Sequence, residues 1–467
     1  MTLSLISGLL LFAFMLFDGY LESSPEWKKY QAGYKKLFIK NAKDEAAKER
    51  AKSLEVELKQ IYLDVLKRVD RCTSCHIGVE NPLMANAQMV YKQHSGDYLK
   101  DHPVDRFGCT ICHDGQGRAL STKEAHGTGR DMHWDYPIMP LKYVQSSCAR
   151  CHDFEMLKHN RGERVAGGEK LFREKGCKGC HKLNGVGGVL GNALDRVGSQ
   201  PFAFFPMRYV KGEHTVYAWH QQHFDDPRNI VPESEMKIDV KGEDSDLLTT
   251  FILSLKSEEI PRQYRRIWQS PLSKEEAMNG ESLYKMYCIG CHTSGKYSIY
   301  DDIFRRTIPA VMNPAFLKSI DDKFLRKIIE EGRSNTQMTA WKADAAGLSY
   351  KKINKIIKYI TTDRPVEQSE PFGFSNFNAN IENGEELYQV RCQFCHGPKG
   401  EGGENILGIS LNNPVVQKEA EPEFLAITIR DGRQGTPMVA FGNKGVGLGD
   451  QEIVDIVAYV RTLSVKK

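Results

Sequence analysis

The sequence predicts a mostly α-helical, multidomain protein, and three features support that prediction. The motif C-x-x-C-H occurs six times and uses all 12 cysteines of the 467-residue chain. The pattern Gly-Glu-x-Leu-aromatic precedes three of these motifs, at 168–172, 280–284 and 384–388. Each of those three regions also closes with an amphipathic stretch whose apolar residues lie three and four positions apart. We therefore expect an N-terminal transmembrane helix, a long helix, a loop-rich module and three small helical domains.

The first element is apolar from Leu3 to Phe17. A full membrane span needs about 20 residues, a length that Thr2 to Leu21 reaches if Asp18 lies at the interface. A cleaved signal peptide has a basic first region and a small-residue cleavage site, and neither is visible. We therefore expect residues 1–24 to form an uncleaved transmembrane anchor.

The second element, residues 25–70, is predicted to be one long helix without an internal proline. Apolar residues such as Trp27 and Tyr34 recur at helical spacing. At 1.5 Å per residue this helix would be on the order of 65 Å long. It forms either a stalk or a helix folded back on the first domain, and Gly33 and Asn41 are possible breaks.

The spacing of the six motifs defines the remaining parts. The first three lie close together and predict a shared module over 71–162, whereas the last three are about 100 residues apart and predict separate domains over 163–265, 273–365 and 378–467. The segment 329–341 also aligns with 429–441, including Gly-Arg-x-x-Thr-x-Met in both.

The motif C-x-x-C-H is the attachment signature of c-type haem, because two thioether bonds and one iron–imidazole bond must come from one turn. A zinc site would not demand a histidine after every second cysteine, and a redox pair would not recur six times. We therefore predict six covalently bound haem c groups. The predicted attachment residues are Cys72, Cys75, Cys109, Cys112, Cys148, Cys151, Cys177, Cys180, Cys288, Cys291, Cys392 and Cys395, and the proximal ligands are His76, His113, His152, His181, His292 and His396.

Methionine is expected as the sixth iron ligand in the last three domains. Met338 and Met438 both lie in the shared Gly-Arg-x-x-Thr-x-Met loop, against the alternative that they only fill the core. In the first of the three domains Met236 is the candidate and Met207 its competitor. Helix, motif, methionine loop and closing helix together resemble the small monohaem cytochrome c fold.

Histidine is expected as the sixth ligand in the triple-motif module, which has no such methionine loop. The spare histidines are His94, His102, His126, His133 and His159, from which we choose His102, His126 and His133. The alternative is a core or surface histidine. His214, His220 and His223 are interpreted as structural, or as hydrogen-bonding groups near the fourth haem.

Composition excludes one class of partner. The formal net charge is +4 and the mean hydropathy is −0.47, so the bulk of the chain is hydrophilic and its charge is too small to indicate nucleic-acid binding.

The segments 58–82, 102–119 and 143–152 resemble the membrane-anchored multihaem cytochrome c subunits of bacterial Rieske/cytochrome b (bc-type) complexes. The resemblance implies an electron-transfer subunit of a quinol:cytochrome c-type oxidoreductase, not catalytic alone. Its partners would be cytochrome b and Rieske-type subunits, the membrane and a soluble periplasmic redox protein. The expected location is the inner membrane, with the haem domains on the periplasmic side.

Two alternatives stay open. A free-standing membrane-anchored carrier would need no bc-type partner. A multihaem reductase or peroxidase would need one haem without a sixth protein ligand. Histidine-only haems have lower potentials than His/Met haems, so the predicted ligands place the low-potential haems first along the chain.

Overall fold

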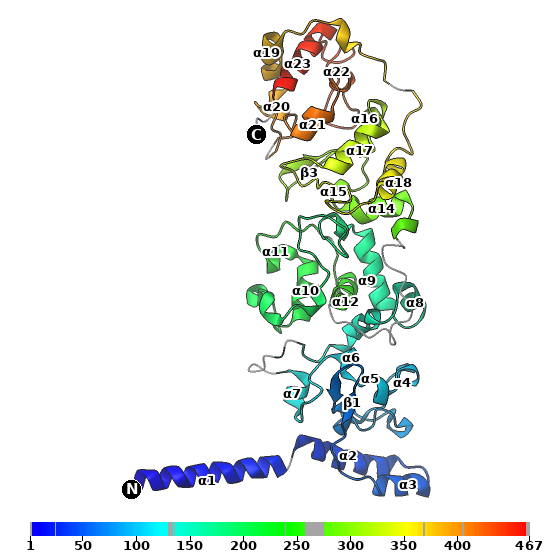
Figure 1. Cartoon of the computed structure of the whole chain (residues 1–467), viewed down its shortest axis with the longest axis vertical. Helices are drawn as coiled ribbons and strands as arrows, with labels where there is room; N and C mark the ends of the chain where they lie inside the picture. The colour runs from blue at the N-terminus through cyan, green and yellow to red at the C-terminus, as the bar shows by residue number, and fades with distance from the viewer. Residues whose placement is uncertain are drawn as a thin grey trace. The chain divides into compact units, whose positions relative to one another are not determined.

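The fold comes from a computed structural model that describes residues 2–23, 25–128, 134, 136–238, 240–256, 275–367, 369–403 and 406–463. Short helices joined by loops make up most of the described chain (Figure 1). The chain divides into two compact units. Unit 1 is mainly Met1–Val165, and unit 2 is mainly the chain from Ala166 onwards.

Unit 1 contains short helices and one β-hairpin. Strands β1 (Ile61–Leu63) and β2 (Arg68–Asp70) pair antiparallel, with Ile61 opposite Asp70. Its helices are α1 (Thr2–Ser23), α2 (Glu26–Asn41), α3 (Glu45–Lys52), η1 (Cys72–Ser74), η2 (Pro82–Met84), η3 (Met89–Tyr91), α4 (Tyr98–Asp101), α5 (Val104–Phe107), α6 (Thr110–His113), α7 (Thr122–His126), η4 (Leu141–Arg150) and α8 (Phe154–His159), with η7 (Phe202–Phe204) from further along the chain.

The predicted transmembrane anchor is wrong. Helix α1 forms, but no helix in the described part of the chain is both long and apolar enough to cross a membrane. The apolar run, Leu3–Phe17, is interrupted by Ser4, Ser7 and Gly8 and is shorter than the span of about 20 residues that the hydrocarbon core requires. The predicted location at the inner membrane through this anchor is corrected with it.

The single long helix predicted over 25–70 is also wrong. Helix α2 ends at Asn41, whose side-chain amide donates to the carbonyl oxygen of Leu83 at 3.1 Å. Asp44 then starts α3, because its carboxylate accepts the N–H of Ala47 at 2.7 Å. Residues 25–70 thus form two helices and a hairpin that pack within unit 1.

A glutamine fixes this return. The Gln31 side chain donates to the carbonyl oxygen of Glu57 at 2.7 Å and accepts the N–H of the same residue at 3.0 Å. These paired bonds hold the non-helical segment after α3 against α2 and lead the chain into β1 and the first C-x-x-C-H motif.

Unit 2 repeats one helical arrangement three times. Its strands β3 (Ile299–Asp301) and β4 (Arg306–Ile308) form one antiparallel hairpin. Its helices are α9 (Glu163–Glu174), η5 (Cys177–Gly179), η6 (Val197–Ser199), η8 (Met207–Tyr209), α10 (Val216–Asp225), α11 (Pro227–Ile230), α12 (Glu243–Ser254), α14 (Gly280–Tyr287), α15 (Ile289–His292), α16 (Pro314–Lys318), α17 (Asp322–Glu331), α18 (Tyr350–Ile360), η10 (Phe374–Asn376), α19 (Ile381–Arg391), α20 (Gln393–His396), α21 (Pro414–Glu419), α22 (Pro422–Asp431) and α23 (Asp450–Thr462).

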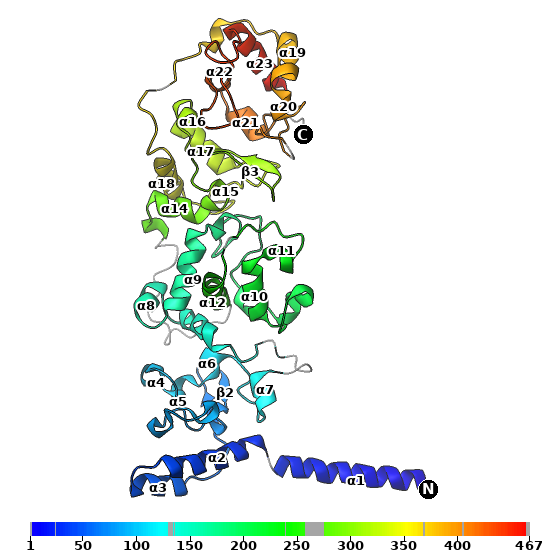
Figure 2. The ribbon, with the colours of Figure 1, turned by 180° about the vertical axis from the view of Figure 1, so that it is seen from behind.

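The Gly-Glu-x-Leu-aromatic pattern explains how each arrangement is held. The helix before the motif crosses the closing helix at the glycine, as α19 and α23 do in both ribbon views (Figures 1 and 2). A Cβ atom at Gly168, Gly280 or Gly384 would collide with the carbonyl oxygen of Leu247, Lys355 or Asp455. Glycine is therefore required at each crossing.

The aromatic residue four positions later completes the crossing. Its ring packs on an aromatic ring of the closing helix, with centroids 5.0 Å apart for Phe172 and Phe251. The equivalent pairs are Tyr284–Tyr359 at 5.5 Å and Tyr388–Tyr459 at 5.3 Å. Rings at these separations attract each other beyond the burial of their surface, so the pattern specifies the same helix pair three times.

Candidate haem-binding sites

Each C-x-x-C-H motif forms one helical turn of the same geometry. In all six, the N–H of the histidine donates to the carbonyl oxygen of the first cysteine over 2.8–3.0 Å. The N–H of the second cysteine donates to the same oxygen over 3.1–3.2 Å. A single turn thus presents two thiols and one imidazole together, as two thioether bonds and one iron bond require.

The thiols are in the state that covalent attachment consumes. All 12 cysteines are free, and no disulfide joins any of them. Burial raises the pKa of Cys177 and of Cys288 to about 12. Both thiols are therefore protonated at neutral pH. Thioether formation consumes free thiols of this kind, whereas a disulfide framework would join them in pairs.

The proximal histidines of unit 2 are oriented by backbone carbonyl groups. The Nδ1 atom of His181 lies 2.8 Å from the carbonyl oxygen of Asn192, that of His292 lies 3.3 Å from Pro309, and that of His396 lies 2.9 Å from Ile409. A carbonyl oxygen only accepts, so Nδ1 carries the proton and Nε2 keeps a free lone pair. Such an orientation prepares Nε2 to bind a metal ion.

Glycines make room beside two of these imidazoles. A Cβ atom on Gly191 would collide with the ring of His181, and one on Gly408 would lie 2.6 Å from the Nδ1 atom of His396. The backbone therefore approaches the rings closely enough to hold them in place.

The three candidate methionines share a backbone feature. The N–H of Met338 donates to the Thr336 hydroxyl at 3.1 Å, and that of Met438 donates to the Thr436 hydroxyl at 3.2 Å. Met236 makes the same bond, at 3.2 Å, to the hydroxyl of Ser234. Its competitor Met207 begins the short helix η8. Met236 is thus the local equivalent of the other two.

A cavity of about 370 Å³ brings motif and methionine together in the last two domains. Its lining includes both cysteines, the proximal histidine and the methionine of each domain, along with apolar side chains. An apolar wall with one sulfur and one imidazole nitrogen suits a porphyrin with His/Met ligation. The residues present fit haem c.

Unit 1 places its histidines in three facing pairs. The ring centroids are 6.1 Å apart for His76 and His126, 6.0 Å for His94 and His113, and 5.8 Å for His102 and His152. Imidazole nitrogen binds a transition metal at roughly 2.0 Å, so two rings on opposite sides of one ion have centroids roughly 6 Å apart. Each pair has the separation of two axial ligands.

Two of the three predicted distal histidines belong to these pairs. His126 faces His76 and His102 faces His152. His94 faces His113, although the sequence prediction passed over it. His133, which was predicted in its stead, lies outside the described residues. Nothing local in the sequence separates His94 from the other spare histidines, because the pairing depends on how the loops of unit 1 fold together.

Comparison with known families agrees with these sites. Residues 275–360 and 379–460 match the family described as cytochrome c oxidase, cbb3-type, subunit III, and residues 165–256 match the family described as cytochrome c. Each matched stretch contains one C-x-x-C-H motif and one of the candidate methionines.

The chain is a multihaem c-type cytochrome.

Two solved structures show limited similarity to this cytochrome. The reducing HAO-like protein complex of Kuenenia stuttgartiensis is 20% identical over 40% of this chain and 95% of that chain, with a TM-score of 0.26. Thiosulfate dehydrogenase from Marichromatium purpuratum is 14% identical over 52% of this chain and 60% of that chain, with a TM-score of 0.22. No curated protein sequence matches the cytochrome significantly.

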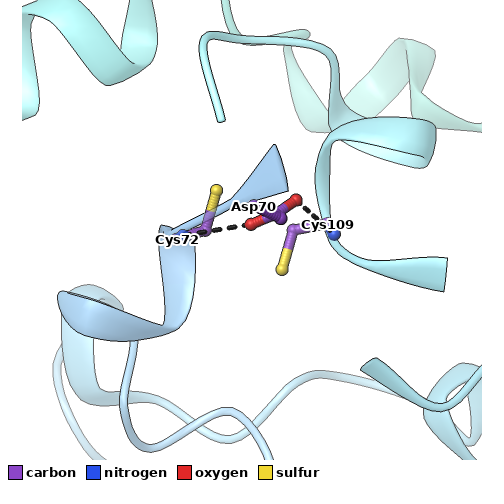
Figure 3. A group of neighbouring side chains, drawn as sticks. All are labelled: Asp70, Cys72 and Cys109. Atoms are coloured by element: carbon purple, nitrogen blue, oxygen red, sulfur yellow. Dashed lines mark hydrogen bonds between the residues drawn. The ribbon is translucent and has the colours of Figure 1, made fainter. Parts of the chain in front are cut away.

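A buried aspartate joins the first two attachment turns of the cytochrome. The carboxylate of Asp70 accepts the N–H of Cys72 at 3.0 Å and that of Cys109 at 2.8 Å (Figure 3). It also accepts the N–H of Thr110 at 2.9 Å. The ligand atoms of Asp70, Cys72 and Cys109 all lie within 4.8 Å of one another. Both thiols belong to C-x-x-C-H motifs, so we interpret this group as the junction between two attachment sites.

Hydrogen bonds keep Asp70 ionised. Burial would raise the pKa of its carboxyl group, but the bonds from Cys72, Thr110 and Cys109 outweigh burial and hold that pKa below its ordinary value. A permanent negative charge therefore lies where the first two motifs meet.

A second junction lies in unit 2. The thiols of Cys180 and Cys291 interact, which raises the pKa of Cys180 and lowers that of Cys291. The backbone of the two turns also meets, because a Cβ atom on Gly290 would lie 3.1 Å from the carbonyl oxygen of Gly176. The two cysteines belong to neighbouring domains, so the fourth and fifth attachment sites adjoin.

The three histidines near the fourth motif differ in their surroundings. The ring of His223 stacks on Trp219 with centroids 4.5 Å apart, and His220 is buried. Burial, followed by the charge of His223, lowers the pKa of His220 to about 3, so it is neutral at physiological pH. His214 is exposed. That His214, His220 and His223 are structural, or form hydrogen bonds near the fourth haem, remains a prediction.

Proposed function

We propose that the cytochrome carries six haem c groups and passes electrons from a quinol-oxidising complex to a soluble redox protein. The observation that supports this most is the sixfold recurrence of one attachment turn, each with a candidate second ligand. Bound haem supplies a one-electron iron couple. The cysteines tether it, and the proximal and distal side chains hold its iron from two sides.

The proposed distal ligands divide between the units. In unit 1 they are His126, His94 and His102, opposite His76, His113 and His152. In unit 2 they are Met236, Met338 and Met438. Two protein ligands on every iron leave no position for a substrate, which favours electron transfer over catalysis.

Ligand type also orders the sites by potential. Thioether ligation raises the potential of a haem relative to histidine-only ligation. We propose that electrons enter at unit 1 and leave from unit 2. This direction of electron flow, from lower to higher potential, is inferred from the proposed ligands alone.

The proposed electron donor is a complex with cytochrome b and Rieske-type subunits. The sequence segments that resemble subunits of such complexes, 58–82, 102–119 and 143–152, all belong to unit 1. They surround the first three attachment turns. This resemblance supports contact between the donor and unit 1.

The haem number and ligands can be tested on the purified cytochrome. Intact-mass measurement is expected to find six added haem groups. Met438→His is expected to lower one midpoint potential in a redox titration while the protein stays folded. Fewer than six haems, or high potentials for the haems of residues 71–160, would contradict the proposal.

The partner is tested by isolating the tagged cytochrome from native cells. Co-isolation of a b-type cytochrome and reduction by a quinol analogue are expected. Isolation as a lone chain that quinol does not reduce would overturn this part while leaving the haem assignment intact.

A further inference from the structure

The last two domains contact each other through a reciprocal pair of asparagines. The Asn313 side-chain amide donates to the carbonyl oxygen of Gln434 at 2.8 Å, and the Asn413 amide donates to that of Ser334 at 2.6 Å. The two bonds join equivalent positions of the repeat, 100 residues apart, in opposite directions. The contact is therefore nearly symmetric.

Each asparagine also begins a helix of its own domain. The Asn313 side-chain oxygen accepts the N–H of Ala315 at 3.0 Å, and that of Asn413 accepts the N–H of Val415 at 3.1 Å. One side chain thus caps its own helix and holds the methionine loop of the other domain. The loops that carry Met338 and Met438 therefore both lie at the contact between the last two domains.

Each of these loops contributes a buried arginine. Arg333 and Arg433 line the same cavity as the two proximal histidines and the two methionines. The guanidinium group of Arg433 lies 4.7 Å from the ring of Phe316 in the other domain and 5.6 Å from Phe424 in its own. The two domains together enclose Arg433.

The charges of these arginines lack a compensating anion. Across the described residues, no carboxylate forms an ion pair with either guanidinium group. Burial lowers the pKa of both side chains to about 10, and the charge of Arg333 lowers that of Arg433 further. Two buried cations that line one cavity are unfavourable unless anions accompany them.

Haem brings such anions, because its porphyrin carries two propionate carboxylates. Each arginine lines the cavity beside the proximal histidine of its own domain, and its backbone N–H donates to the carbonyl oxygen of that domain's methionine, at 2.8 Å for Arg333 and 2.7 Å for Arg433. Each is therefore near its own haem site. Guanidinium groups bind carboxylates through two parallel N–H bonds.

We propose that Arg333 and Arg433 bind the propionates of the fifth and sixth haems at one shared, positively charged junction. The junction makes these two haems an electrically coupled pair. A cation beside a haem disfavours the ferric state, so each arginine raises the potential of the haem that it contacts and, more weakly, that of the other haem. This inference rests on the proposed haems at Cys288/Cys291 and Cys392/Cys395.

The test is a redox titration of the full-length cytochrome with Arg433→Gln or Arg333→Gln. Each variant is expected to lower two midpoint potentials, that of its own domain more than that of the other. Those midpoints are also expected to become dependent on pH near neutrality, because a propionate that has lost its arginine can take up a proton. A purely structural role would not produce this pH dependence.

Arg430→Gln is the matched control. Arg430 lies three residues before Arg433, and its guanidinium group pairs with Asp431 at 2.8 Å. It is expected to leave all midpoints and their pH dependence unchanged. Arg433→Lys retains the charge and is expected to keep the midpoints nearer to those of the natural protein than Arg433→Gln does.

Mass measurement of the same samples separates the two proposals. A natural protein without haem on the fifth or sixth motif would contradict the proposed function. Fully loaded Gln variants with unchanged midpoints and pH dependence would overturn the arginine junction. If one Gln variant does not acquire its haem, the other Gln variant decides, and unchanged midpoints and pH dependence in that loaded variant overturn the proposal.

Discussion

Units 1 and 2 hold their candidate haem sites in different ways. Each site of unit 2 adjoins a crossed helix pair, and the last two adjoin compact apolar clusters. In unit 1 the facing histidines come from short segments, including α6 and α7, which have four and five residues. Helices this short are not stable alone. Unit 1 also has an apolar cluster, which includes Tyr34, Phe38 and Met84, but none of its facing histidines belongs to it. The sites of unit 2 are therefore held by packed helices, whereas those of unit 1 are held by short segments.

The largest expected effect concerns the distal histidine of the second site. His94→Ala is expected to open one iron in unit 1, because His94 is the residue that faces His113 at 6.0 Å. The measurement is the spin state of the haems, together with cyanide binding. His133→Ala is the comparison variant; a high-spin signal from it rather than from His94→Ala would return the assignment to His133.

The next effect concerns the junction at Asp70. Asp70→Asn removes the charge and an acceptor from three N–H donors, so it is expected to destabilise unit 1 by about 3 kcal/mol at neutral pH. Denaturant unfolding measures this loss. Asp64→Asn, at an exposed carboxylate paired with Lys67, is expected to change stability little.

The Asp70 effect is also expected to depend on pH. Its pKa is lower in the folded protein than in the unfolded chain, where it is about 3.9. The stabilisation is therefore fully present above the unfolded pKa and lost as pH falls through the folded pKa. The difference between the natural protein and Asp70→Asn should shrink in that acidic range; a constant difference would contradict this account.

A smaller effect tests the helix crossing of unit 2. Gly168→Ala places a Cβ atom against the carbonyl oxygen of Leu247 and is expected to cost about 2 kcal/mol. Gly167→Ala is the matched control, because its nearest contact would be an ordinary 3.5 Å to a Leu247 methyl carbon. That change is expected to stabilise α9 by up to about 1 kcal/mol. Equal effects of the two variants in thermal unfolding would show that the crossing is not tight.

Sequence reasoning succeeded where a short pattern carries its own geometry. The C-x-x-C-H motif predicts its turn because the cysteines and the histidine are local neighbours. The match between 329–341 and 429–441 predicts two equivalent methionine loops, and both contain the same threonine–methionine bond. The Gly-Glu-x-Leu-aromatic pattern predicts three repeated regions, and the structure adds that its glycine is the point where two helices cross.

Sequence reasoning failed where the structure of a segment depends on contacts with distant parts of the chain. Helical spacing predicts one helix over 25–70, with Asn41 as a possible break, and α2 does end at Asn41. The hydrogen bonds that fold the rest of the segment back, from Asn41 to Leu83 and from Gln31 to Glu57, are not predictable from local sequence. The pairing of His94 with His113 likewise depends on loops meeting in space; the prediction for His133, which lies outside the described residues, is untested. The apolar run of α1 is simply too short for the span that its composition suggested.

The reciprocal asparagines make each of the last two domains depend on the other for hydrogen bonds. Neither domain alone completes the hydrogen bonding of its own methionine loop, since the carbonyl groups of Ser334 and Gln434 are each satisfied from across the contact. Separating the two domains would leave one carbonyl group in each methionine loop without its asparagine donor. The duplicated halves are thus mutually dependent, and a chain shortened before residue 378 would lose more than its final domain.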